Sequence, residues 1–399
     1  QMCIRDSYNT ARDLFSSLRG VEIYKTVGFK DIALIHGDTE QSYQKTAQLI
    51  NRIRHQKQGG TPYRTLHECT EKEGREVLDY IDKNARSILS ENGFSEDGTC
   101  QVIKLEYNNA HPVTVSRRNV LNAVDKCCRD NTINAEDILN NPVPYEDPGS
   151  STQISIDDVH VKKQEEFRPG GIKSERGKRK YIHNTIAHIS KVEVGKYVLN
   201  GPGTKDVLLF LTAFLFQNGL IGNRIQFFTD GHKTLNSSIF KGFSWYKNIG
   251  IILDWYHLEK KCKEQLSLAL KGRNIRNETL DTLKPLLWHG LTDKAVAHLE
   301  SIGKDSIKKI ESLDNLMEYL KRNKPYIPCY AVRKELNLCN SSAIGEKMND
   351  LVVSSRQKHN GMSWSKKGSL GLATITAIKR NKENDKWFET KSLDFKLVA

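Results

Sequence analysis

The chain has 399 residues, of which 38% are hydrophobic, so it can bury a sizeable core and is expected to form two or three domains. Its 61 lysines and arginines against 48 aspartates and glutamates give a net charge of +13, which favours nucleic acid as a partner. No apolar run approaches the roughly 20 residues of a membrane span and no export signal is found, while eight cysteines without a C-x-x-C pair or zinc-finger spacing indicate the reduced thiols of a cytosolic protein.

The first part of the chain is predicted to be mainly helical. The opening residues QMCIRDS resemble vector- or adaptor-derived sequence and are excluded from the fold interpretation. Apolar residues recur with helical spacing from Thr39 to Gly59, and a second helix is expected from Thr61-Pro62 to Gly74. Two helices joined by a short glycine turn over 39–74 resemble a helix-turn-helix, and an ordinary helical hairpin fits the same pattern.

More elements are expected before residue 150. The pattern predicts a helix over 75–92 closed by Gly93, a strand over 101–107, and a basic helix that Ser116 caps and that ends at Arg129. The stretch 140–150 is dense in turn-forming residues and is interpreted as a domain boundary. Residues 8–150 then form a mainly helical DNA-binding region.

From Gln153 the apolar residues take the period of strands. Strands are expected over 154–161, 181–194, 196–199, 225–229 and 249–253, with a buried helix over 205–218 between the third and the fourth. The order of three strands, helix, strand, helix, strand and helix is that of an RNase H-like α/β core, in which a mixed five-stranded sheet has flanking helices. Residues 151–274 form the first part of this catalytic core.

Beyond Leu258 the sequence predicts helices and no strands. Residues 275–328 are interpreted as an all-helical insertion. Residues 329–399 are interpreted as the C-terminal part of the catalytic core and a tail, and the last core helix is expected to begin near Ser342.

Acidic residues are placed where the predicted sheet could use them. Asp230 and Asp254 each end a predicted strand, Asp157 lies in the first strand, and Glu346 lies one turn into the last core helix. In open α/β sheets, catalytic groups gather at the carboxyl ends of strands. Mg²⁺ prefers hard oxygen ligands, and two ions about 4 Å apart serve in-line phosphoryl displacement. The pattern therefore suggests a carboxylate site for two Mg²⁺ ions, with Mn²⁺ as a substitute.

Each acid also has an ordinary structural interpretation. Asp157 and Asp158 are adjacent in a strand and point to opposite faces, so only one of them can face the site. Asp230 and Asp254 could each start a turn or cap the next helix, and Glu346 could be a first-turn residue that the helix dipole favours. The residues alone leave these alternatives open.

Motifs that follow one another along residues 39–371 carry a resemblance to a known family. They are SYQKTAQLINRIR at 42–54, IDDVHVKKQ at 156–164, TDG at 229–231, LDWYHL at 253–258, GEK at 345–347 and GMSWS at 361–365. Together they resemble the Mutator-like bacterial insertion-sequence transposases with a DDE core, and more closely the ISLre-type family. Each motif alone is weak, and it is their occurrence together in this order that makes the resemblance specific.

The resemblance implies a site and an activity. It makes Asp157, Asp230 and Glu346 the catalytic metal ligands, without settling which of the two adjacent aspartates is used. Asp254 and His257 match a D-x-x-H element, which in relatives lies beside the active site and helps to organise it or the DNA. The implied reaction is Mg²⁺-dependent strand cleavage at the ends of an insertion sequence and strand transfer of the freed 3′-hydroxyl, in the bacterial cytoplasm and on the nucleoid when DNA is bound.

Double-stranded DNA, as transposon ends and as target, is the expected partner of a homodimer or higher oligomer. Between Val159 and Asn200 ten lysines and arginines stand against four acids, which suits phosphate contacts, although a solvated hairpin tip fits as well. An indole near two lysines could stack on an unpaired base, and core packing is the alternative for it. The candidate DNA-binding residues are Lys173, Arg176, Lys178, Arg179, Lys180, Trp364, Lys366 and Lys367.

Two other functions fit the same residues. An RNase H-like, structure-selective nuclease would cleave without strand transfer, and a catalytically inactive remnant of a transposase would only bind DNA. The long helical stretch between Asp230 and Glu346 favours the transposase, and the presence of all three acids argues against the remnant.

Overall fold

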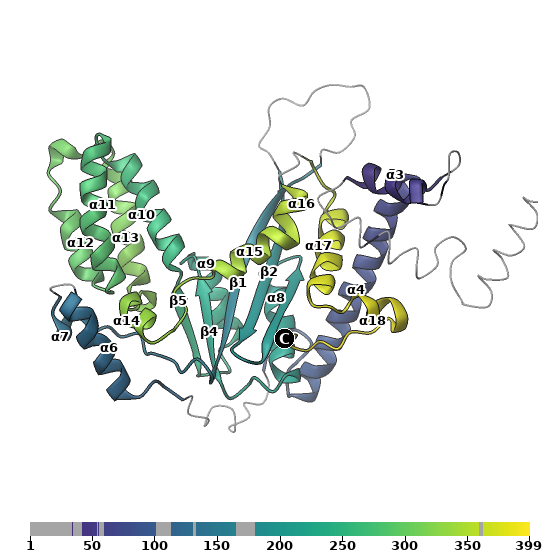
Figure 1. The fold of residues 1–399 in the computed structure, drawn as a ribbon, viewed down its shortest axis with the longest axis horizontal. Helices are drawn as coiled ribbons and strands as arrows, with labels where there is room; N and C mark the ends of the chain where they lie inside the picture. Colours follow the sequence, from purple (N-terminus) through teal and green to yellow (C-terminus); the bar gives the residue numbers. More distant parts are fainter. Residues whose placement is uncertain are drawn as a thin grey trace, which may run out of the picture.

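A sheet of five strands lies at the centre of the molecule, with helices on both faces and a body of helices beyond its β5 edge (Figure 1). The computed structural model describes residues 42–53, 60–100, 113–130, 133–164, 180–358 and 362–399, together with Leu34 and His55. The strands are β1 (Ser151–Lys162), β2 (Tyr181–Lys191), β3 (Gly195–Gly201), β4 (Arg224–Thr229) and β5 (Ile249–Leu253).

The strand order confirms the predicted mixed sheet. The order is β3-β2-β1-β4-β5, in which β1, β2 and β3 pair antiparallel while β4 pairs parallel with both β1 and β5. All five predicted strands and the buried helix α8 (Thr204–Gln217) are present, with ends shifted by three residues at most. This arrangement is compatible with an RNase H-like core.

Helices cover both faces of β1, so both sets of its alternating side chains have partners. Ile154 and Ile156 pack in the core that α8 fills, and α8 is apolar on nearly every side because it is buried against the sheet. The opposite face of β1 meets helix α15 (Ala343–Asn349). A Cβ at Gly345 would come 2.2 Å from the Ser155 hydroxyl oxygen, so this close approach of helix and strand requires glycine.

Helix α4 (Tyr63–Glu91) runs unbroken through Gly74, so the helix end predicted at that glycine is wrong. A Cβ at Gly74 would come 2.4 Å from the Gly371 Cα of helix α17 (Lys366–Arg380). The glycine therefore serves a close helix crossing, which a one-dimensional pattern does not distinguish from a helix end. The short helix α3 (Tyr43–Ile53) precedes α4 and packs against it through Ile50.

The rest of the N-terminal part packs on two different regions of the chain. Helix α4 shares the core of the sheet with α8, whereas α6 (Arg117–Asp130) and α7 (Ala135–Leu139) pack against α14 (Tyr330–Glu335). The basic helix predicted after Ser116 is thus confirmed as α6, and the strand predicted over 101–107 lies outside the described residues. The domain boundary at 140–150 stays a prediction.

The helical body beside β5 has a core of its own. It comprises α10 (Trp255–Ala269), α11 (Arg273–Trp288), α12 (Thr292–Glu300) and α13 (Ile310–Asn323), with 3₁₀ turns at Lys304–Ser306 and Lys324–Tyr326. Leu266, Leu283 and Leu316 are fully buried between these helices. Because α10 begins directly after β5, this core reaches from the edge of the sheet outward.

The C-terminal part returns to the sheet. Helix α15 begins at Ala343, which confirms the start predicted near Ser342, and it continues through a π turn (Asp350–Ser354) into α16 (Ser355–Gln357). Helices α17 and α18 (Asn384–Thr390) were not predicted, and α17 is buried over most of its length against α4 and β3. Among the described helices, none combines the length and the apolar character that crossing a bilayer requires.

Candidate active site

The register of the parallel strands sets three aspartates in a row. Asp157 and Asp230 each lie two residues beyond the last parallel pair of β1 and β4. Asp230 and Asp254 each lie one residue beyond the last pair of β4 and β5. Because neighbouring strands are about 4.8 Å apart, the three residues follow one another across the sheet at one level. The aspartates that the sequence separates by long intervals are therefore neighbours in the fold.

Asp157 faces the side of the sheet on which α15 lies. Its Oδ2 accepts a hydrogen bond from the side-chain amide of Asn349 at 3.0 Å, and its Oδ1 accepts one from the backbone N–H of Asp158 at 2.8 Å. Asp158 is exposed on the opposite face, where its carboxylate accepts a hydrogen bond from the Thr185 hydroxyl. The structure thus places Asp157, and not its neighbour, on the side of Glu346.

Asp230 stands at the exit of β4 on a turn with a fixed shape. Its Oδ1 accepts the backbone N–H of His232 at 2.8 Å, and its backbone carbonyl accepts the hydroxyl of Tyr319 at 2.8 Å. Gly231 follows with φ of +77°, a left-handed conformation that glycine adopts without strain. Within the described part of the chain, Oδ2 of Asp230 accepts no hydrogen bond, so half of this carboxylate is available to another group.

Asp254 has a different environment from its neighbour, since its side chain is only 1% exposed and its residue is the N-cap of α10. Its Oδ1 accepts the backbone N–H groups of Tyr256 at 2.7 Å and His257 at 3.2 Å. Its Oδ2 accepts the Ser342 hydroxyl at 2.6 Å and also the Ser342 backbone N–H. Both oxygens are therefore used, and this carboxylate joins the start of α10 to the segment that enters α15.

The side chains of His257 and Glu346 connect these two helices, with 3.0 Å from Nε2 to Oε1. The side chains are 25% and 38% exposed, so the pair is open to solvent on one side. His257 lies in the first turn of α10 and Glu346 in α15, and Asp254 fixes both helix starts. Both polar residues of the D-x-x-H element thus position the glutamate. Asp254 holds Ser342 at the entrance to α15, and His257 contacts Glu346 itself.

The acids influence one another electrostatically. Burial raises the pKa of Asp157, the charge of Asp230 raises it further, and the hydrogen bond from the Asp158 N–H opposes both. Burial also raises the pKa of Glu346, and His257 lowers it while Asp254 and Asp157 raise it. Burial is thus the main cause of both shifts, and the neighbouring carboxylates add to it.

The donor types at the site match Mg²⁺, which takes carboxylate oxygens and is commonly held by one or two carboxylates together with water and substrate phosphates. Within the described residues, no three side chains of His, Cys, Asp or Glu converge closely enough to form the shell of a metal ion. Two of the three predicted ligands have other partners, since Glu346 contacts His257 and Asp157 contacts Asn349. Asp157, Asp230 and Glu346 therefore have the ligand atoms and the negative charge that suit Mg²⁺.

The residues predicted to bind DNA have mixed outcomes. Trp364 is 5% exposed and donates its indole N–H to the Gln357 carbonyl at 3.2 Å, so of the two interpretations offered for it the structure shows core packing and not a base-stacking platform. The ring packs under the Arg356 guanidinium with Val353 and Leu372 because the bridge from Lys163 to Trp364 draws the segment onto β1. Lys180, Lys366 and Lys367 are exposed, whereas Lys173, Arg176, Lys178 and Arg179 lie outside the described residues.

Asn349 is a site residue that the sequence interpretation missed. It lies three residues after Glu346, so both side chains are on one face of α15, and that face meets Asp157. A helical spacing of three from the predicted glutamate is the signal that would have found it. Tyr256 lies between Asp254 and His257; it is 49% exposed, and its backbone N–H donates to Asp254.

Comparison with known proteins adds little to this geometry. No protein-family model matches the chain, and no curated protein matches it. Among solved structures, the chain is similar to the Drosophila P element transposase strand transfer complex, with 9% sequence identity and a TM-score of 0.27. The alignment covers 99% of this chain and 89% of the other. A TM-score this low does not establish a common fold, so functional conclusions have to come from the residues themselves.

Proposed function

We propose that the chain is a DDE-type transposase that cleaves DNA strands and transfers the freed 3′-hydroxyl at the ends of an insertion sequence. One observation carries the proposal: Asp157 and Asp230 lie at one level of the neighbouring strands β1 and β4, and the charge of Asp157 acts on both Asp230 and Glu346, although the three come from distant parts of the chain. An RNase H-like core supports phosphoryl transfer through such acids.

The three acids would hold Mg²⁺, or Mn²⁺ in its place, and a pair of such ions is the arrangement that serves in-line phosphoryl displacement. When bound, the ions supply charge neutralisation and a lowered pKa for the attacking water or hydroxyl. The chain itself contributes orientation. Asn349 holds one oxygen of Asp157, the His232 N–H holds one oxygen of Asp230, and His257 holds Glu346.

Asp254 has a supporting role in this proposal and does not bind the ion. Its two oxygens already accept hydrogen bonds from the starts of α10 and α15, so a metal ion would have to displace them. The remaining contacts with DNA are electrostatic. Lys180, Lys366 and Lys367 are exposed and would contact phosphates, and a homodimer or higher oligomer would bring two DNA ends together.

The test uses the purified full chain, Mg²⁺ and a plasmid that carries the DNA flanking the gene. The wild type is expected to nick or linearise this plasmid, and Asp230→Ala is expected to leave it intact. Equal cleavage by both proteins would show that the proposed site is wrong. A matched pair sharpens the result: Asp157→Ala should abolish cleavage and Asp158→Ala, on the opposite face, should not.

The products separate the transposase from the structure-selective nuclease. Strand transfer joins a 3′-end of the element to a target DNA and gives a covalent product of larger size, whereas hydrolysis alone gives only shorter fragments. A labelled, pre-cleaved element end and an unlabelled target plasmid are therefore incubated with the wild type. Transfer of label to the plasmid supports the transposase, and its absence while the plasmid with element ends is cut supports the nuclease.

A further inference from the structure

Two adjoining cavities on the helical body form a basic groove that the proposed site does not use. One cavity of about 590 Å³ is lined by Ser267, Leu270, Gly272, Arg273, Arg276 and Lys308, and no acid is among these residues. The second, of about 310 Å³, shares Ser267 and Arg276 with the first, and its lining includes one acid, Asp281. The two together run along α10 and α11 and are named the α10–α11 groove below.

The cations of this groove differ in how far they are neutralised. Lys263 and Lys284 both pair with Glu259, at 2.8 and 2.6 Å, so that end of the groove has little free charge. Within the described chain, by contrast, Arg273 and Lys308 form no side-chain hydrogen bond or ion pair. Arg276 contacts only the neutral side chains of Asn277 and Ser267. Three uncompensated positive charges therefore converge on the 590 Å³ cavity.

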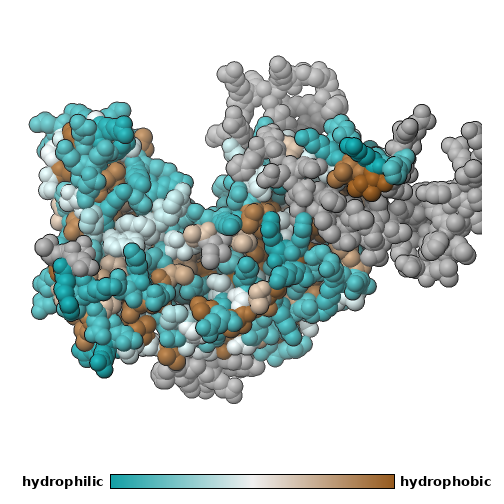
Figure 2. Space-filling view, viewed as in Figure 1, coloured by the Kyte–Doolittle hydropathy of each residue, from teal (hydrophilic) through white to brown (hydrophobic). Residues whose placement is uncertain are grey.

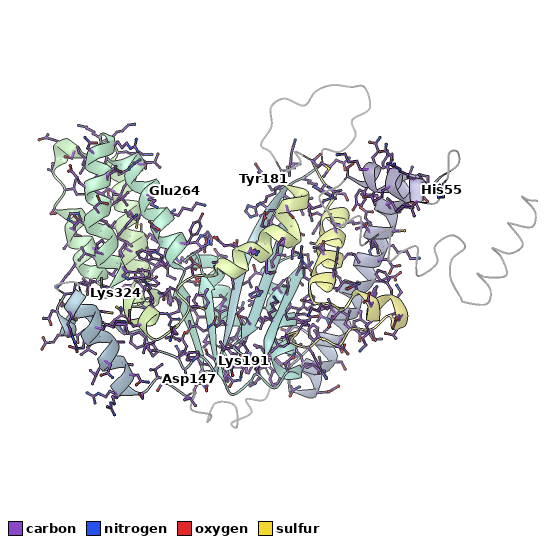
Figure 3. All side chains as sticks on the ribbon, viewed as in Figure 1. His55, Asp147, Tyr181, Lys191, Glu264 and Lys324 are labelled. Carbon is purple, nitrogen blue, oxygen red and sulfur yellow. The ribbon has the colours of Figure 1, made fainter. Side chains whose placement is uncertain are left out.

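An exposed strip of α10 connects this groove to the candidate active site. Tyr256, Lys260, Glu264 and Ser267 recur at intervals of three and four residues, and all four are exposed. Glu264 points away from the helical body towards the hollow beside it (Figure 3), and the surface is concave there between that body and the part around α16 (Figure 2). The strip contains one lysine, Lys260, and one acid, Glu264.

The length of α10 sets the distance between site and groove. His257 and Ser267 are ten residues apart in one helix, which corresponds to a rise of about 15 Å. In B-form DNA about 15 Å along the axis spans four to five base pairs. A duplex whose cleaved phosphate lies at the acids would thus present a phosphate to the groove about half a helical turn away.

We infer that the α10–α11 groove binds backbone phosphates of DNA about four to five base pairs from the cleaved bond. Arg273, Arg276 and Lys308 supply the contacts, and the groove sets the angle at which the duplex crosses the acids. This inference rests on the proposed function for its partner. Its role is positioning, because these side chains lie too far from Asp157 and Asp230 to take part in the reaction.

The first experiment measures DNA binding as a function of salt. A labelled duplex is titrated with wild type and with the variant Arg273→Gln/Arg276→Gln/Lys308→Gln between about 50 and 200 mM NaCl, without Mg²⁺. If all three side chains contact phosphates, the slope of log K against log salt falls in magnitude by about 2.7. The control Lys205→Gln/Lys241→Gln/Lys247→Gln removes the same charge from the α8–α9 side and should leave the slope near the wild-type value.

The outcome is decided by the difference between the two variants. An unchanged slope in the groove variant, or an equal fall in both variants, would overturn the inference. Thermal unfolding of both proteins checks that neither substitution has disrupted the helical body. This binding assay needs no cleavage, so the inference can fail while the proposed function stands, and an inactive wild type would not decide it.

A second experiment locates the contact on the DNA. Single phosphates near the cleaved bond are replaced by neutral methylphosphonates, and the binding of each duplex is measured. Wild type should lose affinity when the replacement lies about four to five base pairs from that bond, and the groove variant should not respond to it. Equal responses of wild type and variant at every position would contradict the placement of the groove on the DNA.

Discussion

Strands β4 and β5 are each followed by an aspartate, and the two aspartates have different surroundings. Each strand delivers an aspartate to the same edge of the sheet, and each aspartate precedes a helix. Asp254 is buried, and its two oxygens accept four hydrogen bonds, whereas Asp230 is half-buried and keeps one oxygen without a partner among the described residues. The difference shows that a strand-end aspartate which caps a helix is distinguished from one with an available oxygen by what its oxygens contact.

The largest expected effect belongs to Asp230. Asp230→Asn should reduce DNA cleavage by at least about a thousandfold, equivalent to about 4 kcal/mol of transition-state stabilisation, because the substitution removes a charge that the reaction needs. Its unfolding free energy should stay within about 0.5 kcal/mol of the wild type, since the amide still accepts the His232 N–H. Urea unfolding measures the stability and plasmid cleavage measures the activity. A strong loss of stability would mean that Asp230 acts as a structural cap, as Asp254 does.

Asp254 should show the opposite balance. Asp254→Ala removes the cap of α10 and leaves the Ser342 donors without an acceptor, so the unfolding free energy should fall by about 2 to 3 kcal/mol. Asp254→Asn keeps one acceptor oxygen for the cap, so its unfolding free energy should fall by less than that of Asp254→Ala. Urea denaturation at pH 7 distinguishes them. If Asp254→Ala unfolds like the wild type and only cleavage is lost, this residue belongs to the metal site.

His257 should have a smaller effect, exerted through Glu346. His257→Ala leaves the glutamate without its 3.0 Å partner and should lower cleavage roughly tenfold, or about 1.4 kcal/mol. The double variant with Glu346→Gln should be no slower than Glu346→Gln alone, because both changes remove the same interaction. Additive losses in this cycle would mean that His257 acts on the substrate directly.

The smallest expected effect is a pH dependence of stability at Asp157. The folded protein raises the pKa of this carboxyl, chiefly by burial, so ionised Asp157 disfavours the folded state. The contribution of Asp157 to the unfolding free energy is fully present below the pKa that this carboxyl has in the unfolded chain. It is lost as the pH rises through the higher pKa that the carboxyl has in the folded protein. Asp157→Asn should therefore unfold at higher urea than wild type at pH 7, with the gap closing as the pH falls towards the ordinary pKa of a carboxyl. A gap that widens on acidification would contradict the sign.

The sequence predicted the sheet better than the packing around it. Strands β4 and β5 have continuous β-branched and aromatic runs, so their ends and their aspartates could be read directly. Gly74 was misread because a helix crossing and a helix end both select glycine, and only the position of Gly371 separates them. Burial of Trp364 depends on contacts with Val353 and Leu372, which no local pattern carries.

The sequence named candidate acids but not the surroundings of each. A resemblance assigned Asp157, Asp230 and Glu346, while the choice between Asp157 and Asp158 needed the strand's facing, which Asn349 and Thr185 reveal. The environment that separates Asp254 from Asp230 depends on Ser342, which is far away in the sequence and becomes visible only in the fold.

The central claim is that Asp230, and not Asp254, holds a divalent ion, and Mn²⁺ binding tests it most directly. Isothermal titration of Mn²⁺ into the wild type, Asp230→Asn and Asp254→Asn, each checked for folding, compares the two strand ends in one readout that needs no DNA. The account predicts that Asp230→Asn weakens Mn²⁺ binding at least about tenfold, a loss of about 1.4 kcal/mol, while Asp254→Asn binds like the wild type. Equal binding by wild type and Asp230→Asn, or loss only in Asp254→Asn, would contradict it.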